Sequence, residues 1–260
     1  ISAMAPLLIL VILHALFSSP VIALADSSIL NILGEKRHLY GRQRLWGAVG
    51  WGLAAPLVGE LTQRFGLSQA FTVYGLLGIG CLVCALLLPT GIPRTRGPFW
   101  VGMRQLFKQP AWIIFLLTMF LAGMGSSASS SYLFLRMQDQ GAVKSLMGLT
   151  LTAGSVSELV VFTLSSHILR ALGPRRSLLI ALAASTLQLL LYSVIRNPAW
   201  ILAAQLLHGL SFSLRMTSAV SYADASAPPG LGTTAQAIYG SVGTGLASAL
   251  GNLLAGLIYD

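Results

Sequence analysis

The sequence has very few charged residues. Only 9% of its 260 residues are Asp, Glu, Lys or Arg, whereas 55% are hydrophobic and the mean hydropathy is +0.78. A soluble domain carries roughly 25% charged residues, which it needs to cover its surface. The shortage therefore excludes a soluble globular protein, a disordered chain and a fibre. It predicts an all-α, multi-pass integral membrane protein embedded in a lipid bilayer.

Patterns typical of catalysis or metal binding are also missing. The two cysteines, Cys81 and Cys84, form a C-x-x-C inside an apolar run. We interpret them as small residues on a lipid-embedded helix, because a redox pair would need an aqueous route. The sequence has no His/Cys spacing typical of a metal site and no nucleophile–base pair. We therefore expect no metal, no cofactor and no enzymatic activity.

Long apolar runs predict eight membrane-spanning helices, because about 20 apolar residues cross the hydrocarbon core. The predicted spans are 4–33, 44–62, 70–89, 111–134, 145–171, 177–195, 199–223 and 234–258. The connection 90–110 is rich in Pro, Arg and Gly, which is typical of a linker. We therefore expect a first bundle at 1–89 and a second bundle at 111–260. Both ends of the chain look like cut ends, so we expect a piece of a longer protein.

The basic residues orient these spans. Eleven of the 16 Lys and Arg residues lie in alternate gaps between the spans, including the linker, and four lie in the opposite gaps. Because cytoplasmic loops carry the excess of Lys and Arg, this distribution places the linker in the cytoplasm. It also explains the net charge of +9 without nucleic acid as a partner. The gap before the last span departs from the pattern, because it contains Asp224 and no Lys or Arg.

Three charged residues stand out inside predicted spans, where a charge at the bilayer centre costs roughly 2.5–3.5 kcal/mol on insertion scales. Asp26 either has a functional role or meets water at the membrane interface. Glu158 must face a bundle interior or a cavity, unless it is protonated and held by Ser155 or Ser157. Arg215 either pairs with Glu158 or extends toward the cytoplasmic interface.

Polar and small residues give weaker signals. His208 lies on one helix face with Gln205, and a lone histidine is either a packing residue or a proton carrier. Small residues recur every four positions on the last span, a spacing that favours close helix packing in lipid. These residues are Gly243, Ala247, Gly251 and Ala255. Gly47 and Gly50 predict similar packing for the second span.

The embedded charges are suited to proton coupling. A low-dielectric cavity raises the pKa of a carboxyl group toward neutrality, and an arginine partner lowers it again. A carboxylate–arginine pair that forms and breaks can therefore take up and release a proton. We predict that Glu158, Asp26, Arg215 and His208 carry this function.

Residues 40–51 read Tyr-Gly-Arg-Gln-Arg-Leu-Trp-Gly-Ala-Val-Gly-Trp and resemble the major facilitator superfamily. They are similar to the Gly-Arg-x-Arg-x-x-Gly-x-x-Gly-Trp pattern that opens the fifth transmembrane helix of the lactose permease-like branch, which includes the domain-containing protein 6 group. The resemblance implies that Arg44 binds solute and pairs with Asp26, and that Trp51 stacks on the solute. It further implies that Glu158 is a carboxylate of the family's eighth helix.

The resemblance covers nearly the whole chain and implies family helices four to eleven of a twelve-helix fold with two pseudo-symmetric bundles. It implies a secondary transporter that moves a sugar, nucleoside or organic acid by alternating access, in symport with protons. One departure is that the family's closely spaced His and Glu are replaced by His208 and Arg215. The alternative is therefore a receptor or scaffold that keeps the transporter fold without transporting.

Overall fold

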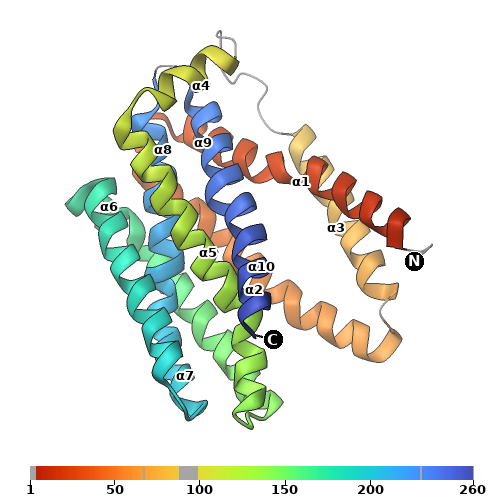
Figure 1. The fold of residues 1–260 in the computed structure, drawn as a ribbon. Coiled ribbons are helices and arrows are strands. Elements are labelled where there is room, and N and C mark those ends of the chain that lie inside the picture. The colour runs from red at the N-terminus through yellow and green to blue at the C-terminus, as the bar shows by residue number, and fades with distance from the viewer. Residues whose placement is uncertain (1–3, 67, 88–98, 229, 260) are drawn as a thin grey trace.

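The structure is a computed structural model that describes residues 4–66, 68–87, 99–228 and 230–259; within these ranges it is helical and has no strand (Figure 1). The N-terminal helices are α1 (Met4–Leu33), α2 (Tyr40–Phe65) and α3 (Ser68–Leu86), with the 3-10 segment η1 (Gly34–Leu39) between the first two. The C-terminal helices are α5 (Pro110–Asp139), α6 (Lys144–Val194), α7 (Ala199–Ala204), α8 (Arg215–Ser226), α9 (Gly232–Gly240) and α10 (Ala247–Tyr259).

The helices follow the predicted spans, which confirms the all-α fold class. α6 contains two of these spans, which are divided by a break at Gly173, where φ is +74° and ψ is 166°. Only glycine adopts this φ without strain, and the following Pro174 has no N–H for the helical ladder. By length and composition, three helical segments of the described ranges could cross a membrane. They are Pro110–Asp139, Leu146–Val194 and Gly232–Tyr259.

The predicted linker at 90–110 is partly helical. Its residues 99–107 form α4 (Phe99–Phe107), which carries Arg104 in its last turn. The stretch 88–98 lies outside the described residues. α4 comes immediately before α5 in the chain and lies at one end of the molecule (Figure 1). η1 and the break in α6 lie toward the same end in Figure 1. We call this end the basic end.

Two of the predicted spans are irregular helices. Between α7 and α8, the chain forms the 3-10 segment η2 (Gln205–Leu207) and the π-helical segment η3 (Gly209–Leu214). Between α9 and α10, it forms a second π-helical segment, η4 (Ser241–Leu246). π turns are rare and often occur at functional sites, because they change the rotation of the side chains that follow. The first of them directly precedes Arg215.

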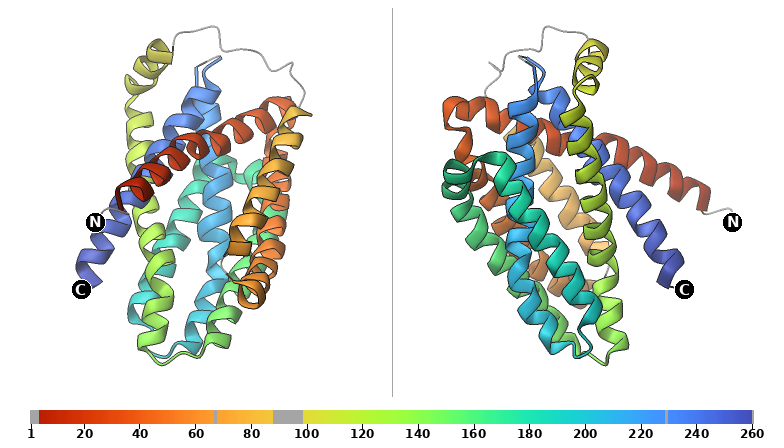
Figure 2. Two further views of the ribbon diagram at one scale, coloured as in Figure 1. Left: turned by 90° about the vertical axis from the view of Figure 1, so that its right-hand side faces the viewer. Right: turned by 60° about the vertical axis from the view of Figure 1, so that its left-hand side comes forward.

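The N-terminal helices contact the C-terminal helices mainly near the basic end. α1 packs on α9, and α2 packs on α6. Figure 2 shows α2 and α3 side by side, and these helices contact each other. The second half of α2 and most of α3 expose large apolar side chains, such as Leu53, Leu57, Phe71 and Tyr74. These two helices therefore touch the rest of the molecule through the start of α2.

The small residues of the last span pack closely against α5, as predicted. A Cβ atom at Gly123 would lie 2.2 Å from the carbonyl oxygen of Gly243 and 2.7 Å from the Cβ of Ala247. A Cβ at Gly251 would lie 2.6 Å from the carbonyl oxygen of Met124. Backbones that approach this closely stabilise helix pairs in lipid by van der Waals contact.

The similar prediction for α2 was wrong in its residues. A Cβ at Gly47 or Gly50 would meet no described atom within 4 Å. The close approach is at Gly41, where a Cβ would lie 1.9 Å from the Oγ of Ser165 on α6. Helical spacing shows which glycines share a face, but it does not show which part of that face a partner covers.

Gly123→Val is expected to destabilise the packing of α5 on α10 by about 1–3 kcal/mol, because the added methyl groups meet backbone atoms that cannot move aside. The midpoint of thermal unfolding in detergent should fall measurably. Gly78→Val is the control, because a Cβ at Gly78 has no described atom within 4 Å. Equal midpoints for the two variants would contradict the close approach of these helices.

Candidate functional site

The first group of embedded polar residues lies where α1 meets α2. Asp26 is only 4% exposed. Its Oδ1 accepts a hydrogen bond from the Tyr40 hydroxyl at 2.7 Å and lies 3.9 Å from Nη1 of Arg44. Tyr40 and Arg44 are four residues apart on α2, so both side chains project from one face of the helix. Asp26 is therefore a buried carboxylate held by a phenol and a guanidinium, not a residue at the water interface.

The structure thus brings Asp26 and Arg44 together, which is the pairing that the family resemblance implied. Trp51 lies two helical turns beyond Arg44 on α2 and is 74% exposed. No contact of Trp51 with Asp26 or Arg44 is present in the described part of the chain. Its role as a stacking surface remains a prediction.

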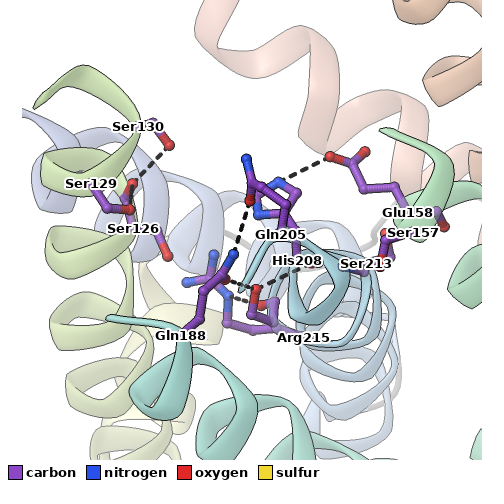
Figure 3. A network of polar contacts seen from close by, with 12 residues as sticks. Ser126, Ser129, Ser130, Ser157, Glu158, Gln188, Gln205, His208, Ser213 and Arg215 are labelled. Atoms are coloured by element: carbon purple, nitrogen blue, oxygen red, sulfur yellow. Dashed lines mark hydrogen bonds and ion pairs between the residues drawn. The ribbon is translucent and has the colours of Figure 1, made fainter. Parts of the chain in front are cut away.

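The second group lies where α6 meets the irregular segment after α7. Nε2 of His208 lies 3.1 Å from Oε1 of Glu158 (Figure 3). Ser157 does not hold this carboxyl group. Its hydroxyl donates to the carbonyl of Leu206 at 2.6 Å and accepts from the backbone N–H of Gly209 at 3.0 Å. Ser157 therefore fixes the two helices to each other and leaves Glu158 to pair with His208.

Of the two alternatives for Arg215, the pairing with Glu158 is not found. Nε of Arg215 donates to the carbonyl of Ser211 at 3.1 Å, one turn earlier on its own helix. In Figure 3 the guanidinium points away from Glu158 and toward the serines of α5, of which Ser126 is one. The π-helical segment between His208 and Arg215 changes the rotation of the residues that follow it, and a periodicity of 3.6 residues does not anticipate this.

A buried hydrogen-bond network supports the second group. The Gln188 amide nitrogen donates to the Tyr192 hydroxyl at 2.7 Å and to Oε1 of Gln205 at 3.1 Å. The Tyr192 hydroxyl also donates to Oε1 of Gln205 at 2.6 Å. Ser211 donates to the amide oxygen of Gln188. Because partly satisfied polar groups are costly in a low dielectric, this network fixes the helix that carries His208 and Arg215.

Tyr239, on α9, lies between the two groups. Its phenol interacts electrostatically with Arg215, Asp26 and Arg44. It also packs against the apolar cluster that joins α1, α2 and α8, which is centred on Leu30, Tyr40 and Val220. Embedded polar residues of α1 and α2 therefore face those of α8 and α9 across one interface. Neither Tyr40 nor Tyr239 was predicted as a site residue, although the spacing of Tyr40 to Arg44 was a usable signal.

The basic end of this interface is closed by an ion pair. Arg37 of η1 donates to Oδ2 of Asp224, near the end of α8. A cavity of about 250 Å³ lies beside the pair, lined by Leu30, Arg37, His38, Leu169, Pro174, Ser221, Asp224 and Ala225. Burial raises the pKa of Asp224, which follows its predicted span, and Arg37 offsets part of this rise. The acidic residue that departed from the loop pattern therefore has a basic partner in another gap.

Reversing one charge of this pair is expected to open the basic end. The Arg37 side chain is 49% exposed and that of Asp224 is 12% exposed, so the pair contributes about 0.2–1 kcal/mol. Asp224→Arg should therefore raise maleimide labelling of a cysteine at Ser221 a few-fold, in a background without Cys81 and Cys84. The exchanged pair, Arg37→Asp with Asp224→Arg, should restore slow labelling. Fast labelling of the exchanged pair would show that the ion pair does not close this end.

Comparison with known proteins places the whole chain in one family. A family model described as "MFS_1 like family" matches residues 2–260. Maltose permease of Geobacillus stearothermophilus is 28% identical over 97% of this chain and 64% of its own length. The "Major facilitator superfamily domain-containing protein 6-like" protein of Danio rerio is 30% identical over 83% of this chain and 41% of its own length.

A third relative has a different named solute. The "Probable 3-phenylpropionic acid transporter" of Escherichia coli (strain K12) is 26% identical over 98% of this chain and 68% of its own length. The chain thus spans between 41% and 68% of the length of these three relatives.

Proposed function

Because the chain belongs to the MFS_1 like family of the major facilitator superfamily, whose members are multi-pass membrane transporters, we propose that it forms part of a secondary active transporter. The transporter moves a small organic solute by alternating access, in symport with protons. In this mechanism, two groups of helices rock about a site between them, which opens to one side of the membrane at a time.

One observation carries this proposal. Embedded ionisable residues occur in both groups of helices and face one interface, through Asp26 and Arg44 on one side and Arg215 on the other, with Tyr239 between them. Ionisable groups inside a membrane are costly and typically mark a solute or proton path. In alternating access, the interface between the two groups of helices moves and its embedded charged residues contact the solute or protons. A receptor or scaffold would not need charged residues on both sides of this interface.

The two ion pairs support different roles. Asp26 is held by Tyr40 and Arg44, and its carboxyl group and the guanidinium can both form hydrogen bonds with hydroxyl groups, so this pair is suited to bind a polar solute. Trp51, on the same helix, would supply a stacking surface. The Glu158–His208 pair joins a carboxyl group to an imidazole, and each of these groups can accept and release a proton. We assign proton coupling to this second pair.

Solute counterflow in proteoliposomes tests the proposal. The full-length protein is loaded with unlabelled solute and given the labelled solute outside. Maltose and 3-phenylpropionic acid are tested first, because they are named for two relatives, and nucleosides follow. We expect saturable exchange of at least one solute class above protein-free liposomes. Folded protein that exchanges none of them would favour the receptor or scaffold instead.

A further inference from the structure

The embedded charges do not balance pair by pair. Asp26 has Arg44 as its partner, and Glu158 has His208. Arg215 has no carboxylate within ion-pair distance among the described residues. Its Nε is satisfied by the carbonyl of Ser211, but no hydrogen bond from its two terminal nitrogens is present in the described part of the chain. Within the described part of the chain, one guanidinium in the interior of a predicted span therefore has no counter-ion.

The position of this guanidinium suits a ligand. Arg215 is half-buried, and Tyr239 lies within electrostatic reach of it. Figure 3 shows the guanidinium pointing toward Ser126 of α5 and away from the Glu158–His208 pair. The rings of His208 and Phe212 stack nearby, with centroids 5.6 Å apart and planes at 4°. The terminal N–H groups of Arg215, which make no hydrogen bond within the described part of the chain, thus point toward a hydroxyl side chain of α5, and aromatic rings lie nearby (Figure 3).

Removing an unpaired cation from water is costly even when it is half-buried, and a counter-ion that binds it offsets part of this cost. The planar guanidinium matches a carboxylate with two parallel hydrogen bonds, which are stronger than those between neutral groups. We propose that Arg215 binds the carboxylate of a monoanionic organic solute. The inference rests on the proposed transport function and names its substrate class, an organic acid in preference to a neutral sugar or nucleoside.

The charge of the solute follows from the same arrangement. Among the described residues, Arg215 is the one embedded arginine of this interface without a carboxylate partner, since Arg44 already faces Asp26. The other Lys and Arg residues of the C-terminal helices lie near the ends of their helices, beside the break in α6 or in connections. A single carboxylate therefore neutralises the site, whereas a dianion would leave one negative charge uncompensated in a low dielectric. The uncharged body of the solute would face the serines of α5 and the ring of Phe212.

The test compares each acid with its neutral isostere. Counterflow is measured with equal pH inside and outside, using the full-length protein and a series of monocarboxylates, each paired with its primary amide. Inorganic phosphate is the second anion, because a guanidinium also binds phosphate in this way. We expect acids to exchange at least about tenfold faster than their amides, and phosphate to exchange no faster than the amides.

Arg215→Gln should lower acid exchange about tenfold or more and the slow amide exchange much less, and Arg215→Lys should recover part of the loss of acid exchange. Arg170→Gln is the matched control. Nε of Arg170 also donates to a carbonyl one turn earlier, that of Ser166 at 3.3 Å, so the control removes the same kind of hydrogen bond on an exposed residue.

Each other outcome overturns the inference in a recognisable way. Equal exchange of acids and amides, or faster exchange of phosphate, would show that Arg215 does not select a carboxylate. Equal losses of acid and amide exchange in Arg215→Gln would show that the residue only stabilises the fold. Exchange of neutral solutes alone would contradict carboxylate binding by Arg215 but agree with a transport function. No exchange of any solute would contradict both carboxylate binding and transport.

Discussion

Arg44→Gln is expected to reduce solute exchange by about two orders of magnitude. The substitution leaves the carboxylate of Asp26, which is only 4% exposed, with the Tyr40 hydroxyl as its one described partner. Breaking a buried ion pair on one side typically costs about 3–5 kcal/mol. It also removes the guanidinium that we assign to the solute. Initial rates of counterflow in proteoliposomes measure the effect.

Two further variants separate folding from solute binding. Arg42→Gln, two residues earlier on the same helix, changes an exposed arginine and should leave the exchange rate within a factor of about two. The double variant Asp26→Asn with Arg44→Gln removes the uncompensated charge, so it should elute from a sizing column like the wild-type protein. If the double variant also recovers exchange, Arg44 is a structural partner of Asp26 and does not bind the solute.

Glu158→Gln is expected to abolish accumulation of solute against its gradient and to preserve exchange. Glutamine has nearly the shape of glutamate and still reaches Nε2 of His208, now 3.1 Å from the carboxyl oxygen, but it cannot carry a proton. A transporter that has lost its proton site still rocks with solute bound, because exchange needs no net proton movement. Uptake driven by an imposed pH gradient should therefore fall to the level without a gradient.

The control for this variant is Glu35→Gln, which changes an exposed glutamate of η1 and should accumulate solute like the wild type. His208→Gln should behave like Glu158→Gln if the two residues form one proton site. Accumulation that persists in Glu158→Gln at wild-type rates would place proton coupling elsewhere in the protein, or remove it.

The helices could be predicted from the sequence because membrane spans are set by local composition. A run of about 20 apolar residues becomes a helix in lipid whatever its neighbours are, since backbone groups must be satisfied within the segment. The break between two spans at Gly173 and Pro174 could also be predicted from nearby residues, because glycine permits a positive φ and proline lacks the N–H of the helical ladder. These features depend on nearby residues alone.

The partners of the embedded charges could be predicted only in part. Asp26 and Arg44 were expected to meet because a family pattern implied it, and the structure places them 3.9 Å apart. The partner of Glu158 is His208 and not Arg215, because a π-helical segment separates the two candidates. Such a segment leaves no reliable mark in a single sequence, since it depends on how neighbouring helices pack.

The contacts that close the basic end were also outside the reach of sequence patterns. Arg37 and Asp224 are 187 positions apart, and either residue alone resembles an ordinary loop charge. Tyr239 lies in a helix with no charged residue, and only the folded chain shows that it separates Arg215 from Asp26. Long-range pairs of this kind depend on the relative placement of two groups of helices.

The most direct test of symport is whether protons move into the vesicles together with the solute. Proteoliposomes with the full-length protein are suspended in a weakly buffered medium, and solute is added without an imposed pH gradient. We expect the medium to become alkaline as solute enters wild-type vesicles or vesicles with the Glu35→Gln control, and to keep its pH with Glu158→Gln. Solute entry into wild-type vesicles without any change in external pH would contradict symport with protons.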